Sequence, residues 1–329
     1  MATDWKVMEE VRGGSCGEIL ASIILLTKNG EKYIRSVLDG LHGQKEIGLA
    51  EVIVIDSGST DRTLEILSAY PVTLKRIPPE EFGHGRTRNL GARMARGKFL
   101  VYLPQDATPL GPDWLHTLLL PFEDPAIAGA YCRQVPRDEA NAMEKFFLLN
   151  TYPARHEVKR IGKRDDISLK RCFFSTVGGA IRASLWKDHP FSENVIMSED
   201  QAWAKEIMAA GHAIAYQPGA QLLHSHQYGI AGVFRRNFDS GFSIQQNFAG
   251  KTGISSIQIL ARLAHEAAFV LRSGRPADIL LFPFYECARH LGFWMGMHAD
   301  LLPARLRKAC GNLDYFWDGA STSQSGNER

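Results

Sequence analysis

Residues 51–63, EVIVIDSGSTDRT, give the clearest indication of fold class. A β-branched apolar run ends at Asp56, and small polar residues typical of a turn lead from it into a helical pattern. Upstream, ASIILL at 21–26 is a second apolar run, followed by the loop TKNG at 27–30. A buried strand followed by a helix, twice in succession, predicts parallel strands covered by helices.

The same alternation continues downstream. Residues 72–77 supply a third predicted strand, 87–95 a third helix, and 98–103 (KFLVYL) a fourth strand. The predicted fold class is therefore α/β with a mostly parallel central sheet. In such a sheet, ligands bind at the carboxyl ends of the strands.

The rhythm changes after the fourth strand. Short strands are predicted at 127–134, 213–216 and 221–224, and the pattern from about residue 228 onward is helical and amphipathic. The predicted division of the chain is an N-terminal extension (1–20), a sheet-containing domain (21–227), a helical region (228–318) and a disordered tail (319–329).

Composition narrows the class of protein. The chain has 329 residues, 45% hydrophobic and 22% charged, as expected of a folded globular protein. Its net charge of +2 provides no global field to attract nucleic acid, so no nucleic-acid partner is expected. The 5 cysteines are scattered, with no C-x-x-C pair, which favours a reducing compartment. No spanning apolar run or secretory signal is found, so the expected location is the cytoplasm.

Two polar side chains stand at the ends of the first two predicted strands. Asp56 ends the second strand and Thr27 ends the first. A carboxylate in this position can accept the N3–H of a uracil or thymine ring. The alternative is turn chemistry, because Asp followed by Ser-Gly-Ser-Thr-Asp also makes a good loop.

A loop with two glycines, FGHGRTRN at 82–89, leads into the third helix. Free backbone N–H groups together with Arg86 and Arg88 would suit a diphosphate. Taken alone, the signal is weak.

Asp106 follows the fourth predicted strand, where a single carboxylate can hold a divalent metal that bridges two phosphates. A turn aspartate is the alternative. The histidines of His224-Ser-His226 close the last predicted strand and would complete a metal site with Asp106. From side-chain alternation along a strand we expect one of them, not both, to reach the metal.

Residues 198–201, SEDQ, begin a predicted helix. Ser198 and Gln201 have the spacing of a capping box, which places Glu199 and Asp200 in the first turn, where the helix dipole favours ionised carboxylates. A carboxylate there can also act as a general base toward an acceptor hydroxyl. Capping alone is the other interpretation.

Taken in order, these motifs resemble glycosyltransferase family 2, the inverting nucleotide-sugar transferases with the GT-A fold. The resemblance spans roughly residues 22–226 and rests on SIILLTKNGEKYI, EVIVIDSGSTDRT, TRNLGARMARGKFLVYLPQDATPLGPDWL and SEDQAWAKEIMAAGHAIAYQP. Within the family, EFGHGRTRN, LPQDA, SEDQAWA and LLHSHQYG look most like the bacterial rhamnosyltransferases that use dTDP-L-rhamnose.

The resemblance implies roles for the nucleotide-binding residues. Thr27, Asn29 and Asp56 would lie around the base and ribose, and Arg86 or Arg88 near the base or diphosphate. Gln105 would belong to the same donor site.

The resemblance also implies a metal and a catalytic base. Asp106 would be the last acid of the family's D-x-D motif and would coordinate Mg²⁺ or Mn²⁺, although Pro104 replaces the first acid. Asp200 matches the catalytic base, and Glu199 would hold the loop or contact the acceptor. Gly178 and Gly179 match a segment that lines the pocket for the donor sugar and acceptor.

The function implied is inverting transfer of a sugar, with L-rhamnose from dTDP-β-L-rhamnose favoured, to a hydroxyl of a cell-surface glycan or lipid-linked acceptor. Two alternatives remain open at this stage. One is a family member that uses a UDP-hexose or UDP-N-acetylhexosamine. The other is a non-catalytic protein that binds nucleotide sugars or glycans, which the missing first acid of D-x-D keeps in play.

The C-terminal helical region mixes aromatic and basic residues. Such a mixture suits peripheral contact with the inner face of a membrane, a homodimer interface, or packing against the sheet-containing domain. The residues concerned are Phe282, Phe284, Tyr285, Arg289, Phe293, Trp294, Met295, Arg305, Arg307 and Lys308.

Overall fold

The structure, a computed structural model, describes residues 19–162, 167–313 and 316–317. Of the predicted N-terminal extension it describes only residues 19 and 20. The predicted tail at 319–329 lies outside the described residues.

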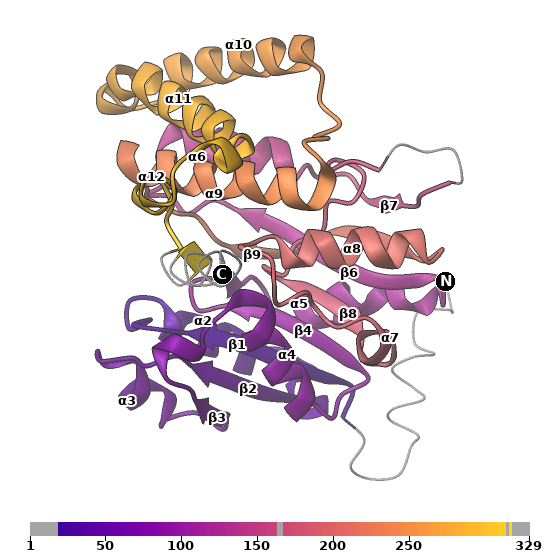
Figure 1. Cartoon of the computed structure of the whole chain (residues 1–329). Coiled ribbons are helices and arrows are strands. Elements are labelled where there is room, and N and C mark those ends of the chain that lie inside the picture. Colours follow the sequence, from indigo (N-terminus) through magenta and orange to yellow (C-terminus); the bar gives the residue numbers. More distant parts are fainter. Residues whose placement is uncertain (1–18, 163–166, 314–315, 318–329) are drawn as a thin grey trace, which may run out of the picture.

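The described residues form a nine-stranded sheet with strand order β3-β2-β1-β4-β8-β6-β9-β5, and β7 pairs with β9 at the side (Figure 1). The strands are β1 (Ala21–Thr27), β2 (Ala50–Asp56), β3 (Thr73–Arg76), β4 (Phe99–Pro104), β5 (Thr108–Pro109), β6 (Ile127–Val135), β7 (Glu157–Lys159), β8 (Gly179–Arg182) and β9 (Ala213–Leu223).

The sheet is mixed, but most of its strands point the same way. Strands β1 to β4 are parallel to one another, β8 is antiparallel to both β4 and β6, and β9 is parallel to β6. Only the short strands β5, β7 and β8 therefore run in the opposite direction. The prediction of a mostly parallel sheet is confirmed. The register pairs Thr27 with Asp56, so these strand ends lie side by side.

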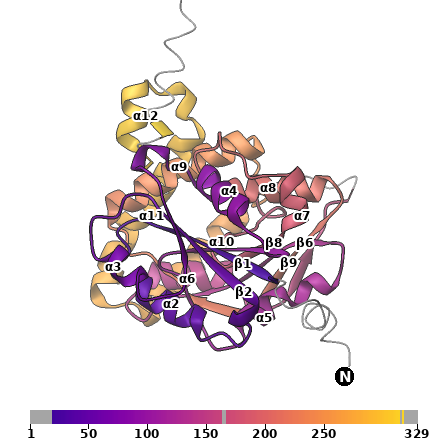
Figure 2. The same cartoon turned by 90° about the horizontal axis from the view of Figure 1, so that it is seen from below.

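Helices cover both faces of the sheet, as Figure 2 shows from below. The first nine are α2 (Ile34–His42), α3 (Thr63–Leu67), α4 (His84–Met94), α5 (Trp114–Leu119), α6 (Ala142–Thr151), α7 (Ala183–Asp188), α8 (Glu199–Ala209), α9 (Ile230–Phe248) and α10 (Ser256–Ser273). They are followed by α11 (Pro276–Met297) and α12 (Ala304–Cys310).

Side-chain alternation along the central strands explains why both faces are covered. Ile23 and Leu25 of β1 face a core shared with α2 and α5, whereas Ile24 faces a second core shared with α4 and α8. All three are fully buried. Strands buried on both faces read as continuous apolar runs, which is the pattern seen at 21–26.

One predicted division of the sheet is wrong. The two strands expected at 213–216 and 221–224 are a single strand, β9, with an irregular register against β6 after Gln217. Pro218 lies at this irregularity and has no N–H to donate to a neighbouring strand. A proline within a strand pattern therefore marked a break in pairing, not the end of the strand.

The C-terminal helices stack on one side of the molecule, with α10 and α11 above α9 in Figure 1. The predicted boundary at residue 227 falls in the non-helical link between Leu223 and Ile230. Helices α9 and α11 approach closely at glycines: a Cβ at Gly296 would lie 1.9 Å from the Phe238 carbonyl oxygen. Among the described residues, no helix has both the length and the apolar character needed to cross a membrane.

Candidate functional site

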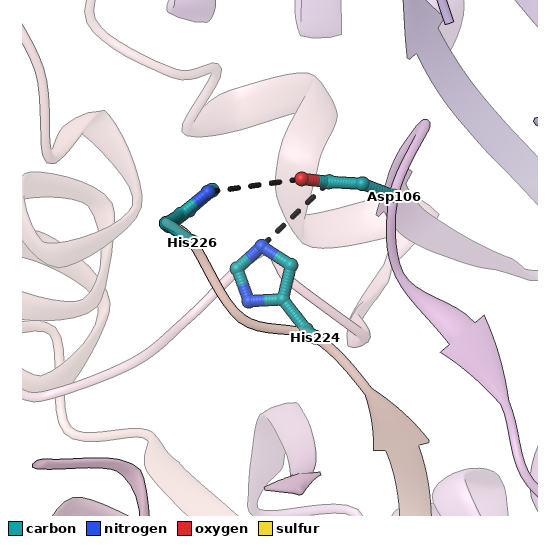
Figure 3. A group of neighbouring side chains, drawn as sticks. All are labelled: Asp106, His224 and His226. Atoms are coloured by element: carbon teal, nitrogen blue, oxygen red, sulfur yellow. Dashed lines mark ion pairs between the residues drawn. The ribbon is translucent and has the colours of Figure 1, made fainter. Parts of the chain in front are cut away.

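Three side chains converge beyond the carboxyl ends of β4 and β9. His224 Nε2 lies 3.6 Å from Asp106 Oδ1, and His226 Nδ1 lies 3.8 Å from Asp106 Oδ2. One ligand atom from each residue falls within 4.8 Å of the others (Figure 3). We refer to Asp106, His224 and His226 as the strand-end triad.

A hydrogen-bond chain orients His224. Gln134 donates from Nε2 to the Tyr152 hydroxyl (2.7 Å) and to Ser175 Oγ (3.2 Å), so its Oε1 is the atom 2.9 Å from His224 Nδ1. His224 therefore carries its proton on Nδ1 and presents the Nε2 lone pair to Asp106. Burial lowers the pKa of His224 to about 4, which keeps the imidazole neutral. A histidine ligates a metal as the neutral imidazole. One ring nitrogen binds the metal, and the other donates its N–H to a hydrogen-bond acceptor.

The expectation that only one histidine reaches this point is wrong. Residues two apart on a strand share a face, and the strand itself ends at Leu223. Both rings therefore reach Asp106, with their centroids 4.5 Å apart and nearly perpendicular.

The strand-end triad fits a divalent metal. A carboxylate and two neutral imidazoles supply three ligand atoms, and their spread of 4.8 Å is close to what metal–ligand bonds of about 2.0–2.2 Å require. Asp106 remains 21% exposed at its side chain, so further positions are open to substrate or water. The two histidines therefore add the metal ligands that Asp106, the single acid at the D-x-D position, could not supply alone.

Gln105 links the ends of β4 and β1. Its Oε1 accepts from the Thr27 hydroxyl at 2.7 Å and from the Lys28 N–H at 2.8 Å, while its Nε2 donates to the Lys28 carbonyl. A Cβ at Gly30 would lie 2.6 Å from Gln105 Oε1, so a larger residue here would displace the Gln105 side chain. Thr27 and Gln105, both of which the resemblance assigns to the donor site, are thus in contact with each other.

Asp56 performs the turn role that the sequence left open. Its side chain is fully buried and accepts from the N–H groups of Gly58 and Ser59, each at 3.1 Å, and from the Ser59 hydroxyl. Asn29 lies beside this turn with φ of 51°, and its Oδ1 accepts from the Thr60 N–H at 2.8 Å. These contacts shape the loops at the ends of β1 and β2.

Asp200 lies at the start of α8 with three hydrogen bonds. Its Oδ2 accepts from the Thr176 N–H (3.0 Å) and hydroxyl (3.2 Å), and its Oδ1 accepts from the Gln201 N–H at 2.8 Å. Burial and the neighbouring Glu199 raise the pKa of Asp200 to about 6. A carboxylate with a pKa in this range is suited to accept a proton near neutral pH.

The predicted capping box at the start of α8 is wrong. Ser198 has left-handed backbone angles (φ 60°, ψ 32°), and its side chain caps nothing. A capping residue needs extended backbone, so Ser198 cannot cap the helix. The sharp turn at Ser198 instead directs Asp200 toward Thr176.

Arg88 and Glu199 form a nearly buried ion pair between α4 and α8. Their side chains are 13% and 4% exposed, so Glu199 has little surface to offer an acceptor. It holds the start of α8 against α4. Arg86 is mostly exposed and lies 3.6 Å from Glu193.

Gly178 and Gly179 lie where β8 begins. Gly178 has φ of 72°, and a Cβ there would lie 2.3 Å from Cys132 Sγ, so glycine is required on both counts. Thr176, which binds Asp200, lies two residues before Gly178. The glycines allow this segment to pass close to β6 and to reach the start of α8.

Sequence reasoning missed Arg137, which lies just beyond β6. Its Nη2 donates to the Asp106 carbonyl (2.8 Å) and Thr108 Oγ1 (3.1 Å), and its guanidinium stacks 4.4 Å from the centre of the Tyr33 ring. Its position at the carboxyl end of a strand was a usable signal. Gln134 was missed because only the fold brings it to His224, 90 residues away in sequence.

A doubly covered α/β sheet with a possible metal-ligand cluster at its strand ends and a carboxylate at a helix start is the arrangement expected of a GT-A fold. Comparison with known proteins agrees. The family described as glycosyl transferase family 2 matches residues 22–181, and a curated member is 30% identical over 284 residues. The chain belongs to glycosyltransferase family 2.

That member is the O-antigen chain rhamnosyltransferase WbaN of Salmonella anatum, matched over 84% of this chain and 89% of its own length. The O-antigen chain rhamnosyltransferase RfbN of Salmonella typhimurium is 29% identical, over 92% of this chain and 98% of its own length. Both similarities run well beyond residue 181 into the C-terminal helices.

A solved structure shares the fold. The mannosyltransferase PcManGT of Pyrobaculum calidifontis, in complex with GDP-Man and Mn²⁺, has a TM-score of 0.52 at 17% identity, over 98% of this chain and 86% of its own. At this identity the likeness supports the GT-A fold alone.

Proposed function

We propose that this enzyme transfers L-rhamnose from dTDP-β-L-rhamnose to a hydroxyl of a cell-surface glycan or its lipid-linked precursor, with inversion at the anomeric carbon. The observation that carries the proposal is the similarity to two O-antigen chain rhamnosyltransferases over nearly the full length of each. Three features of the site also support the proposal: Asp200, the strand-end triad, and the loops at the ends of β1 and β2.

Asp200 is the proposed general base. It removes the proton of the acceptor hydroxyl while that oxygen forms a bond to the anomeric carbon from the face opposite the leaving group. The bond from the anomeric carbon to the diphosphate oxygen breaks, and the electron pair leaves with the diphosphate. Thr176 and Gln201 orient the carboxylate through the hydrogen bonds to both of its oxygens.

The strand-end triad is the proposed metal site. A bound divalent ion would supply positive charge to the donor diphosphate. Two imidazoles and one carboxylate favour Mn²⁺ over Mg²⁺, because Mg²⁺ prefers a shell of oxygen atoms. Gln134 holds His224 in the tautomer that this role requires.

The loops at the ends of β1 and β2 form the proposed nucleotide site. Thr27, Asn29 and Gln105 lie at its edge, and Asp56 shapes it through the turn at Gly58 and Ser59. The carboxylate of Asp56 already accepts three hydrogen bonds. Its proposed recognition of the base therefore requires the bound nucleotide to rearrange these hydrogen bonds.

We propose that the side of the enzyme that receives the acceptor faces the cytoplasmic surface of a membrane. Exposed apolar side chains recur along α11 at 280, 284, 287, 291 and 294, a spacing that places them on one face of the helix. Leu280 is 72% exposed, and Phe284 and Trp294 are each 59% exposed. We call these five residues the α11 stripe. Such a face suits a lipid surface that carries the acceptor.

Thermal-shift titration with a panel of donors tests the proposed donor. The panel is dTDP-L-rhamnose, UDP-glucose, UDP-GlcNAc and GDP-mannose, each at matched concentration with Mn²⁺ and with EDTA. We expect the largest stabilisation with dTDP-L-rhamnose and its loss in EDTA. A larger shift with a UDP-sugar would contradict the rhamnosyl assignment while leaving the family unchanged.

A further inference from the structure

Helix α9 carries two adjacent arginines in different surroundings. Arg235 is exposed and lines an apolar groove between α9 and α11, together with Phe284 and Leu291. Arg236 is partly buried, and its Nη1 lies 3.1 Å from Met197 Sδ. Because successive helical residues point about 100° apart, the two guanidiniums lie on different faces of α9.

Arg236 lies next to both halves of the site. Met197 directly precedes the turn that starts α8, and Ser243 of α9 donates to the Met197 carbonyl at 2.7 Å. On the other side, Tyr228 packs against Gly232 in the first turn of α9, and its ring lies 5.1 Å from that of His226. The α9 backbone is thus anchored to the segments that carry Asp200 and the strand-end triad.

The charge of Arg236 also reaches the start of α4. After burial and Arg88, it contributes to lowering the pKa of His84, the first residue of that helix. The guanidinium therefore lies near the starts of both α8 and α4, and the loop that leads into α4 is the one predicted to suit a diphosphate.

Across the described residues, no carboxylate forms an ion pair with Arg236. The carboxylates of Glu144 and Asp239, on which the charge of Arg236 acts, accept hydrogen bonds from other groups. Glu144 accepts from the His226 N–H at 3.2 Å, and Asp239 accepts from the Trp317 indole at 3.0 Å and from the Asn312 N–H at 2.9 Å. A thioether sulfur is a weak acceptor and neutralises no charge.

The other arginines near the site are already engaged. Arg88 is paired with Glu199 and Arg86 with Glu193. Arg137 donates to the Asp106 carbonyl and stacks on Tyr33. A partly buried guanidinium without a carboxylate is costly unless an anion joins it.

We propose that Arg236, on a helix outside the region matched by the family description, binds the diphosphate of the donor and stabilises the diphosphate that leaves. The guanidinium would donate two hydrogen bonds to phosphate oxygens, in the planar geometry for which arginine is suited. As the bond to the anomeric carbon breaks, the leaving diphosphate gains negative charge, which the guanidinium would stabilise. The inference rests on the proposed function, because it assumes a nucleoside-diphosphate sugar.

Calorimetry with diphosphates and monophosphates tests the role. Binding of dTDP, UDP and GDP, and of dTMP, UMP and GMP, is measured with Mn²⁺ for the wild type, R236Q, R236K and R235Q. We expect R236Q to bind the preferred diphosphate about 10- to 100-fold more weakly, the range for a charge-assisted hydrogen bond, with far less change for the monophosphate. R236K should fall between, and R235Q should match the wild type.

Several outcomes would overturn the inference. One is equal diphosphate affinity in R236Q and wild type. Another is equal weakening of diphosphate and monophosphate, which indicates a structural role. If R236Q does not fold, R236K gives the same comparison, since lysine keeps the charge but loses the planar fork. A wild type that prefers UDP or GDP contradicts the proposed donor and leaves the role of Arg236 intact, whereas a wild type that binds no diphosphate contradicts both.

Discussion

Asp200 experiences opposing influences on its pKa. Burial and the neighbouring Glu199 raise it, while Arg88 and the N–H groups of Thr176 and Gln201 lower it, and the result is a pKa of about 6. The ion pair between Arg88 and Glu199 therefore affects the pKa of Asp200. It fixes the position of the Glu199 carboxylate, which raises this pKa, and of the Arg88 guanidinium, which lowers it.

The pKa of Asp200 predicts the pH dependence of turnover. A base must be ionised to accept a proton, so the rate should rise with pH through a midpoint near 6 and level off above it. The measurement is kcat for donor turnover between pH 5 and 8 at saturating Mn²⁺. A rate that stays level across this range would contradict the assignment of Asp200 as base.

Gln134 should control metal affinity without touching the metal. In Gln134→Leu, His224 loses the acceptor that holds its proton on Nδ1, and Mn²⁺ affinity should fall about 10- to 100-fold. Calorimetric or paramagnetic titration of Mn²⁺ measures the change. Gln217→Leu, on β9 but bound only to the nearby Gly219 N–H, is the control. Unchanged affinity in Gln134→Leu would mean that the triad does not hold the ion in this way.

A nearly buried ion pair links helices α4 and α8, and so joins the donor-side loop to the helix that carries Asp200. The side chains of Arg88 and Glu199 form this pair and are 13% and 4% exposed. Removal of one partner leaves the other charge buried and unpaired, and this costs far more than the pair itself contributes.

Arg88→Ala should therefore destabilise the protein strongly, by about 3–5 kcal/mol in the free energy of unfolding. Arg86→Ala is the matched control on the same helix. Its pair with Glu193 is exposed and should contribute at most about 1 kcal/mol. Urea unfolding of both variants gives the comparison, and similar midpoints would show that the Arg88 pair does not hold α8 in place.

The strands and helices before residue 104 could be predicted from the sequence, because burial on both faces gives continuous apolar runs and the turn residues mark their ends. The start of α8 could not: Ser198 and Gln201 have the spacing of a capping box, but the turn that directs Asp200 to Thr176 requires left-handed backbone. The strand-end residues Asp106, His224 and His226 were predictable one by one. Their support by Gln134 and the approach of Arg236 depend on long-range packing that local patterns do not report.

The α11 stripe places exposed apolar side chains along a single face of the helix. On another face of α11, Gly292 and Gly296 meet the backbone of α9. An apolar helical face of this kind is suited to a lipid surface.

The double variant Phe284→Ser, Trp294→Ser should bind vesicles of phosphatidylglycerol and phosphatidylethanolamine more weakly than the wild type, with donor turnover unchanged. Burial of each aromatic ring contributes about 1.5–3 kcal/mol, so the loss should exceed tenfold in a sedimentation assay. Leu74→Ser, on the exposed edge strand β3, is the control. A variant that binds as the wild type does, or a wild type that forms dimers buried on this face, would contradict the membrane proposal.

Turnover of dTDP-L-rhamnose by wild type and Asp200→Asn, with Mn²⁺ and with EDTA, tests the account most directly. It should be run beside Asp188→Asn, an exposed acid on α7. We expect turnover by the wild type and Asp188→Asn only with Mn²⁺, and a loss of about 10²- to 10⁴-fold in Asp200→Asn with donor binding retained. An Asp200→Asn enzyme that turns over the donor at the wild-type rate, or a wild type equally active in EDTA, would contradict it.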